Sequence, residues 1–240
     1  MRKYLPLLPV IALLTACATT DESTAYPGKT AKQIYEAGHQ SLQEKSYTEA
    51  IKHFEALDTQ YPDVSYTATA LLELAEAYYK KEEYALAIAT ARRFIALYPA
   101  DPRVDYAYYL CGFSEYDQNI GFFEKAFSLD LAKRDLTPFH QAYQDFKTIV
   151  ERFPKSQYTK TAQMYVTRLN NMFARHELEV AEYYFSREAY VASAERASRV
   201  ITRFKGTEAY PKAQALLIKS YHALGETVLE QAAIKATQTP

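Results

Sequence analysis

The sequence predicts an all-α fold in which about five helix-turn-helix repeats stack into a superhelix with two insertions. The first observation is a recurring alanine that is followed twelve residues later by a proline behind an aromatic residue, and proline cannot continue a helix. The second is a small residue twelve positions before the alanine, where it lets two helices approach closely. The third is a set of large apolar residues at helical spacing between the small ones: Phe54, Leu57, Leu74, Tyr78 and Phe94.

The first two repeats carry this pattern in regular form. Gly38, Ala50 and Pro62 define the first, and Ala75, Ala87 and Pro99 define the second. The pattern resembles the tetratricopeptide repeat, a helix-turn-helix unit of about 34 residues. One such pair cannot cover its own apolar face, so the resemblance implies a right-handed superhelix of stacked neighbours. An irregular helical bundle is the alternative.

The later repeats depart from the regular spacing. The third has Ala142 and Pro154, and its additional residues fall between the two helices, at about 117–138. In the fourth, Ala194 takes the alanine position, Gly206 replaces proline and Glu182 stands upstream. Its extra length precedes Glu182, so residues 158–185 are expected to form one long or broken helix.

The chain ends in a degenerate repeat, as expected for a unit that caps the array and meets water on one face. Its helices are predicted at 210–224 and 227–236, with Gly225 and Glu226 in the turn and Ala232 in the alanine position. The five units are therefore predicted at residues 31–67, 68–104, 105–157, 158–208 and 209–240.

The N-terminus has the anatomy of a secretory signal peptide. Two basic residues precede an apolar run at 5–14, which is too short to span a bilayer, and Leu14-Thr15-Ala16-Cys17 follows. These four residues resemble the bacterial lipobox. The resemblance implies that residues 1–16 are removed and that Cys17 carries diacylglycerol and acyl chains, which anchor the protein to a membrane. An ordinary signal with an incidental cysteine is the alternative. Ala18 is not aspartate, which by the same resemblance favours the outer membrane.

Composition limits what the mature chain does. Residues 17–30 are polar and are expected to form a flexible tether. Removing the signal peptide leaves 26 basic against 29 acidic residues, a net charge of about -3, which does not favour nucleic acid. Apart from Cys17 only Cys111 remains, so no intramolecular disulfide forms, and Cys111 is expected to pack in the core.

No pattern of catalytic residues stands out. The five histidines are scattered without a metal-ligand spacing, and the six glycines form no phosphate-binding loop. We therefore expect a protein without enzymatic activity, metal or cofactor, apart from the lipid on Cys17.

Tyrosine is abundant, with 22 residues in the chain and no tryptophan. In a tetratricopeptide array the first helices line the concave surface, where aromatic rings suit an extended peptide with an aromatic end. Packing between helices is the competing explanation for each ring. The groove-facing positions, of which the last four share a helix face, are Tyr35, His39, Leu72, Tyr79, Tyr106, Tyr109, Phe113 and Tyr116.

Two further segments are candidate interfaces. Arg196, Arg199 and Arg203 recur on one helix face and suit an acidic partner, although a solvated face explains them equally well. In the insertion of the third repeat, Lys133, Arg134 and Asp135 are expected at an interface. The phenylalanines of that insertion, which are expected to fold back onto the array, are Phe122, Phe123 and Phe127.

The lipobox, the repeats and the insertions together resemble the BamD family of outer-membrane protein assembly factors. The most specific segments are Phe122-Phe123, Lys133–Asp135, Phe146, Phe153–Tyr158 and Val180–Tyr184. Gly206 and the spacing of the insertion depart from the family pattern, so the family's contacts in these segments are the least transferable to this chain.

This resemblance implies a non-enzymatic scaffold at the periplasmic face of the outer membrane. Its implied partners are the periplasmic domains of the β-barrel insertase BamA, accessory lipoproteins, and unfolded barrel precursors with an aromatic-ended signal. Because the C-terminal units of the family face the insertase, the resemblance favours Arg196 and Arg199 at that contact. The alternative is a tetratricopeptide lipoprotein that acts as a pilotin or a cell-wall coordination factor.

Overall fold

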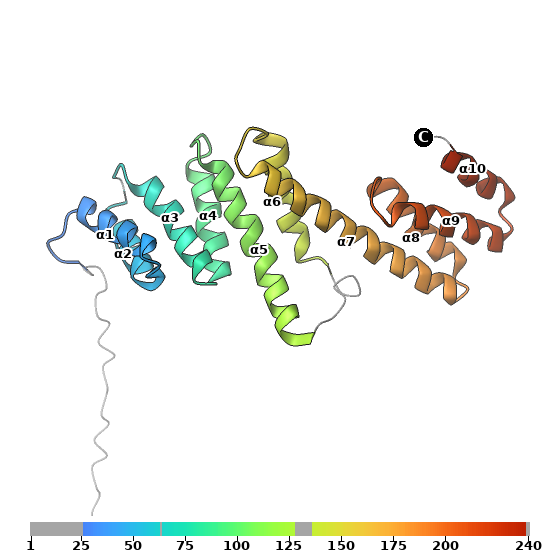
Figure 1. Ribbon diagram of the computed structural model, residues 1–240, viewed down its shortest axis with the longest axis horizontal. Helices are drawn as coiled ribbons and strands as arrows, with labels where there is room; N and C mark the ends of the chain where they lie inside the picture. The colour runs from blue at the N-terminus through green and yellow to red at the C-terminus, as the bar shows by residue number, and fades with distance from the viewer. Residues whose placement is uncertain (1–25, 63, 128–135, 239–240) are drawn as a thin grey trace, which may run out of the picture.

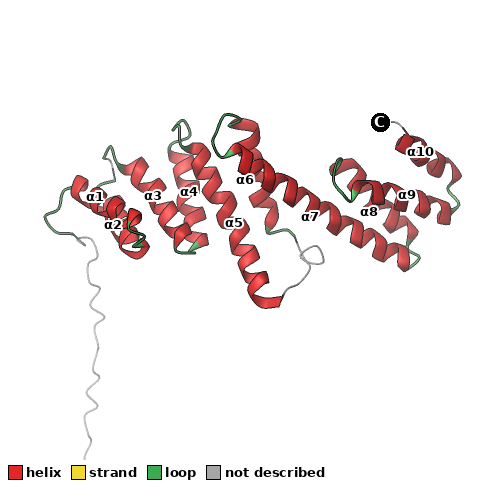
Figure 2. Ribbon diagram, in the orientation of Figure 1, coloured by secondary structure: helices red, strands yellow, loops and turns green. Residues whose placement is uncertain are grey.

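The computed structural model describes residues 26–62, 64–127 and 136–238, with the side chains of residues 121–127 left outside the description. These ranges contain ten helices and no strand, so the predicted all-α fold is confirmed. The helices follow one another in one extended row from α1 to α10 (Figure 1), and loops connect them (Figure 2). Within the same ranges, no helix is long and apolar enough to cross a membrane.

The helices form five consecutive pairs, each with a first and a second helix. Their bounds are α1 Ala31–Gln43 and α2 Tyr47–Gln60, α3 Thr67–Lys80 and α4 Tyr84–Leu97, α5 Val104–Phe127 and α6 Phe139–Arg152, α7 Thr159–Ser186 and α8 Tyr190–Arg203, and α9 Tyr210–Leu224 and α10 Thr227–Gln238.

The array begins at a capping box. The Thr30 side chain accepts a hydrogen bond from the Gln33 backbone, and the Gln33 side chain accepts one from the Thr30 backbone. The residues just before this cap are held against α2. Tyr26 stacks on His53 with 4.6 Å between ring centroids, and the Tyr61 hydroxyl donates to the Lys29 carbonyl over 2.9 Å. The chain therefore enters the array along a fixed path.

A recurring turn joins the two helices of a pair. Lys45, Glu82 and Glu188 have positive φ values of 61°, 64° and 60°, and each stands two residues before its second helix. Gly225 holds the same place before α10, with φ 73°. Only one residue in the left-handed region is needed to reverse the chain this tightly, and glycine adopts that conformation at the lowest cost.

Small residues set the distance between the two helices of a pair. A Cβ atom added at Gly38 would lie 2.7 Å from a Phe54 ring carbon, and one added at Gly112 would lie 2.9 Å from a Phe146 ring carbon. Real Cβ atoms do not approach so closely, so both sites require glycine. Gly112 is therefore the third-repeat counterpart of Gly38. The sequence pattern did not indicate Gly112, because the insertion lengthens the segment between it and Ala142.

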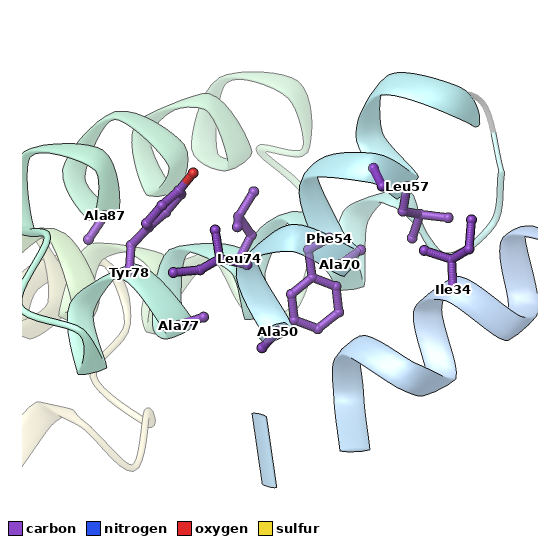
Figure 3. Close-up of a cluster of buried hydrophobic side chains, with 11 residues drawn as sticks. Ile34, Ala50, Phe54, Leu57, Ala70, Leu74, Ala77, Tyr78 and Ala87 are labelled. Atoms are coloured by element: carbon purple, nitrogen blue, oxygen red, sulfur yellow. The ribbon is translucent and has the colours of Figure 1, made fainter. Parts of the chain in front are cut away.

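Four clusters of buried apolar residues run along the array. The first joins α1, α2 and α3 to the start of α4, and Figure 3 shows Phe54 and Leu57 of α2 between Ile34 and Leu74. Helix α7 spans two clusters: Leu169 and Phe173 belong to the third, whereas Ala174 and Leu178 belong to the fourth. The expected long helix in the fourth repeat is thus confirmed as one continuous helix of 28 residues.

The insertion of the third repeat begins differently from the prediction. Helix α5 continues through Asp117 to Phe127 and has 24 residues, so the first part of the additional segment prolongs the first helix and forms no interhelical loop. Ile120 in this extension packs against the third cluster, which gives the extra turns an apolar contact that favours helix.

The predicted register of the fourth repeat is wrong by one residue. Each second helix from α2 to α8 begins at an aromatic residue, and the small residue three positions later is fully buried. In α8 this residue is Ser193, with 0 % exposure, and its partner twelve residues earlier is the buried Ala181. Glu182 is exposed. Serine fills the space of alanine because its hydroxyl accepts a hydrogen bond from Ser220 over 3.1 Å.

The same shift places Lys205, in the fourth repeat, where proline stands in the first three, because Phe204 ends α8 as Tyr61 ends α2. In the last repeat the predicted start and end of α9 are confirmed, but Ala232 is exposed and does not hold the alanine position. Glu230 stands there instead, with its carboxylate 3.1 Å from His222 Nδ1. No residue of α10 is buried, as suits a terminal cap.

Candidate functional site

Tyrosine rings follow the first helices of the first four repeats, and we call this surface the tyrosine face. Its members are Tyr35, Tyr79, Tyr106, Tyr109, Phe113, Tyr158 and Tyr165. Tyr35, Tyr79 and Tyr106, which were expected here, lie on α1, α3 and α5, as the repeat pattern requires. Tyr158 and Tyr165, from the start of α7, were not predicted on this face, because α7 lies beyond the insertion.

The N-terminal part of the tyrosine face is tied by carboxylates. The Tyr35 hydroxyl donates to Glu73 over 3.2 Å, and the Tyr35 ring stacks on Tyr66 with 5.2 Å between centroids. His39 Nδ1 lies 3.0 Å from the same carboxylate. One repeat further, the Tyr79 hydroxyl donates to Asp117 over 2.7 Å. Each of these bonds joins the first helix of one repeat to that of the next.

The central part is a stack of rings between α5 and α7. Tyr158 lies 5.3 Å from Tyr106 and 4.5 Å from Tyr109, measured between centroids. Phe113 lies 4.6 Å from Tyr109 and 4.7 Å from Tyr165. Tyr106, Tyr109 and Phe113 therefore share one face of α5, as predicted. Their rings are half-buried, with one side against the start of α7.

Two expected groove positions are buried instead. Tyr116 is only 5 % exposed, because its ring packs against Phe139 and Tyr165 and carries Arg168 over its face. Leu72 is also buried, in the second cluster. Both residues act in packing, which was the competing explanation for every ring on this surface.

The carboxylates change the chemistry of the hydroxyls. Burial, together with the Glu73 carboxylate, raises the pKa of Tyr35 to about 12. Burial also raises the pKa of Tyr79, where Asp117 adds to the effect, and of Tyr106, where Glu76 does. These hydroxyls therefore stay protonated at neutral pH. The result is a surface of apolar rings with fixed polar tips and negative charge between them, which suits an extended chain with aromatic or cationic side chains.

The three arginines of α8 form the second surface, which we call the arginine ridge: Arg196, Arg199 and Arg203. They differ in how far the protein itself neutralises them. Arg196 contacts Glu177 of α7 over 3.0 Å, and Arg199 contacts Glu195 over 2.8 Å within α8. Arg203 forms no ion pair with any residue that the structure describes.

The arginine ridge separates two hollows, and Arg199 and Arg203 line both of them. The hollow between α6, α7 and α8 has a cavity of about 220 Å³ with an apolar floor that includes Phe173 and Phe204. His140 and His176 stand at its side, and His140 stacks on Phe173 at 4.3 Å. The second hollow, between α8, α9 and α10, measures about 560 Å³ and includes the exposed Val191, Leu224 and Leu229. The first hollow also contains Glu177, and the second contains Glu195 and Glu226. The ridge therefore places positive charge beside a mixed polar and apolar lining, which suits a protein surface with acidic and apolar groups.

Several predicted site residues fall outside the described residues. These are Cys17 and the insertion residues Lys133, Arg134 and Asp135. Phe122, Phe123 and Phe127 lie in the last turns of α5, and their side chains are likewise outside the description. Their predicted roles stay predictions.

Comparison with known families gives one match that covers most of the chain. The family described as "YfiO: Outer membrane lipoprotein" matches residues 27–236. This range takes in every helix from α1 to α9 and nearly all of α10.

Curated relatives that share one name come from several bacteria. The outer membrane protein assembly factor BamD of Xylella fastidiosa (strain 9a5c) is 36% identical over 233 residues, which are 97% of this chain and 80% of that protein. The protein of the same name from Vibrio cholerae is 32% identical over 225 residues, covering 94% and 93% of the two chains. The one from Neisseria meningitidis serogroup A is 32% identical over 233 residues, covering 95% and 87%.

Among solved structures, the crystal structure of MamA protein aligns with a TM-score of 0.36 and 16% identity, over 88% of this chain and 90% of that chain. A likeness this loose carries no argument, so the fold assignment depends on the helices themselves.

Proposed function

The chain belongs to the YfiO family of outer membrane lipoproteins, and on that premise we propose that it is an outer membrane protein assembly factor that works as a non-enzymatic scaffold. Apart from family membership, the main support for a scaffold is that one row of repeats carries two different surfaces. The tyrosine face offers aromatic rings and carboxylates, whereas the arginine ridge offers positive charge. A scaffold needs two such surfaces to hold two different polypeptides together.

The tyrosine face is the proposed site for unfolded barrel precursors. An extended chain offers alternating aromatic side chains and unpaired backbone groups. The rings of Tyr106, Tyr109 and Tyr158 supply apolar contact area at little entropic cost, because tyrosine has few rotors. The hydroxyls and carboxylates around them supply partners for backbone amides. Because half-buried rings in a fixed stack are already ordered, they lose little conformational entropy on binding.

The arginine ridge is the proposed site for the periplasmic domains of the β-barrel insertase. Arg203 is the cation best placed for this contact, because no described residue neutralises it. Arg196 and Arg199 can exchange their internal partners, Glu177 and Glu195, for carboxylates of the insertase. Forked guanidinium contacts to carboxylates combine charge with geometry. Accessory lipoproteins of the machinery are further proposed partners.

We also propose that the protein is held at the periplasmic face of the outer membrane by diacylglycerol and acyl chains on Cys17. The lipobox-like residues 14–17 and the name of the family support this anchor. Replacing Cys17 with alanine should release the protein into the periplasm, as followed by membrane fractionation. Unchanged membrane association would contradict the lipid anchor.

The scaffold proposal is tested by measuring two variants against two ligands. The double variant Arg199→Glu, Arg203→Glu should weaken binding of the insertase periplasmic domains at least tenfold, about 1.4 kcal/mol, while binding of a precursor C-terminal peptide stays unchanged. The double variant Tyr106→Ala, Tyr109→Ala should show the reverse. Lys212→Glu, an exposed charge reversal on α9, is the matched control and should change neither affinity.

Two outcomes would overturn the proposal. If both double variants bind both ligands as the unaltered protein does, neither surface is an interface. If capture from cells recovers secretin subunits in place of the insertase, the protein is a pilotin and the assembly role is wrong.

A further inference from the structure

A cluster of charged side chains lies inside the array between the second and third repeats. Arg92 of α4 makes a two-pronged contact with Asp145 of α6, with distances of 2.8 and 2.5 Å. The same guanidinium lies 3.2 Å from Glu115 Oε1 of α5. The Asp145 side chain is 2 % exposed and that of Glu115 is 11 %, whereas Arg92 is 34 % exposed. Three helices from two repeats therefore meet at one charged contact.

The charges of this cluster do not balance if both carboxyl groups are ionised. Two carboxylates then face one guanidinium, and Arg92 already directs both of its prongs at Asp145. Glu115 Oε2 is buried and has no hydrogen-bond partner among the described residues. Burying a second negative charge beside a single guanidinium costs several kcal/mol, so a proton is the simplest group to restore neutrality.

The other groups that face the cluster from each neighbouring helix add no second positive charge. Arg92 is the charged group from α4, Glu115 and Cys111 come from α5, and Asp145 with the neutral Gln141 comes from α6. Burial raises the pKa of Glu115 to about 7, and the Asp145 charge adds to this effect, while Arg92 opposes it. Burial also raises the pKa of the Cys111 thiol, which therefore stays neutral. The carboxyl pair is the group that titrates.

The cluster joins two parts of the hydrophobic core. Arg92 lies between Ala91 and Phe94 of the second cluster, and Asp145 precedes Phe146, the ring that closes on Gly112 in the third. A change of charge here acts on the contact between the two repeats rather than inside either one.

We propose that Glu115 and Asp145 share one proton, and that losing this proton loosens the joint between α4 and the pair of α5 and α6. The protein then has a stiffer row of repeats in acid and a more mobile central joint in base. A stiff joint fixes the tyrosine face of the first repeats relative to the arginine ridge.

The direction of the pH effect follows from linkage. A carboxyl whose pKa is raised in the folded state stabilises that state fully below its unfolded pKa, near 4.5, and the contribution is lost as pH rises through about 7. The full chain should therefore unfold at a lower temperature at about pH 8 than at about pH 6, by on the order of 5 °C.

Glu115→Gln keeps the shape of the side chain and removes the titration. This variant should lose the fall in unfolding temperature between about pH 6 and about pH 8 that the unaltered protein shows, and should be the more stable of the two at the higher pH. Glu208→Gln is the matched control, because Glu208 is exposed and its side chain has no described contact, and it should keep the fall. A fall that persists unchanged in Glu115→Gln, or that is absent in the unaltered protein, would overturn the proposal.

A second measurement covers the case in which Glu115→Gln does not fold. Amide hydrogen exchange of the unaltered chain, corrected for the intrinsic effect of pH, should reveal increased opening of α4, α5 and α6 at about pH 8, with α9 unchanged. Opening that increases equally along the whole row, or in α9 alone, would show that the joint is not the element that responds.

Discussion

The tyrosine face and the arginine ridge differ in how far their side chains also hold the fold together. On the tyrosine face, the rings also pack on neighbouring helices, and the hydroxyls of Tyr35 and Tyr79 are bonded to carboxylates of the next repeat. On the arginine ridge, Arg196 and Arg199 form exchangeable ion pairs, and Arg203 forms none with the residues that the structure describes.

This difference follows from position in the repeat. The tyrosines stand on first helices, which pack against each other along the row, so a residue there faces both a neighbouring helix and the proposed precursor site. The arginines stand on a second helix beside two hollows, where Arg199 and Arg203 are only partly covered by neighbouring helices. Substitutions should therefore separate the surfaces: the first loses stability and binding together, and the second loses binding alone.

The largest effect on stability is expected from Phe113→Ala. The ring contacts Tyr109, Phe146 and Tyr165, so its removal leaves a gap in the stack and should lower the free energy of unfolding by about 3 kcal/mol. Chemical denaturation measures the change. Phe113→Leu is the control and should cost much less. A loss below about 1 kcal/mol would mean that this ring serves the ligand only.

A medium effect is expected from Tyr79→Phe. The change deletes the hydroxyl that bonds Asp117 across two repeats, and a single hydrogen bond of this kind contributes about 1 kcal/mol to the free energy of unfolding. Tyr47→Phe provides the comparison, because no described residue bonds the Tyr47 hydroxyl, and it should be close to neutral. Equal costs for the two variants would remove the structural role of the Asp117 contact.

The smallest effect on stability is expected from Arg203→Ala. Its guanidinium has no described ion pair, and surface substitutions of this kind change the free energy of unfolding by less than about 0.5 kcal/mol. The same denaturation measurement applies, and binding of the insertase domains should fall nonetheless. If Arg203→Ala destabilises the chain as much as Tyr79→Phe does, the contrast between the two surfaces fails.

Most of the helix order could be predicted from the sequence, because the pattern of small and aromatic residues is set by contacts within each pair. Ala50, Ala87 and Ala142 mark those contacts directly. Ser193 broke the pattern because the expectation was for alanine, although only size and a satisfied hydroxyl are required there. Gly112 was missed because its partner Phe146 lies beyond the insertion, and a fixed spacing cannot find it.

The candidate surfaces were predicted in part. The face that Tyr106, Tyr109 and Phe113 share follows from helical spacing alone, but the rings of Tyr158 and Tyr165 that complete it come from a different repeat. The buried place of Tyr116 depends on Phe139 and Tyr165, which only the packing of three helices brings together. The charged cluster of Arg92, Glu115 and Asp145 involves three distant segments and has no local signature.

Helix α7 has a mechanical consequence for everything on either side of it. Its 28 residues contain neither proline nor glycine and make a rod of about 42 Å, anchored in one core cluster at its start and in another at its end. Such a rod resists bending, so a tilt of its first half also moves its second half and helix α8, which packs against it. If a precursor binds at the proposed site near Tyr158 and the insertase at the proposed site around Arg203, this helix is expected to couple the two sites mechanically.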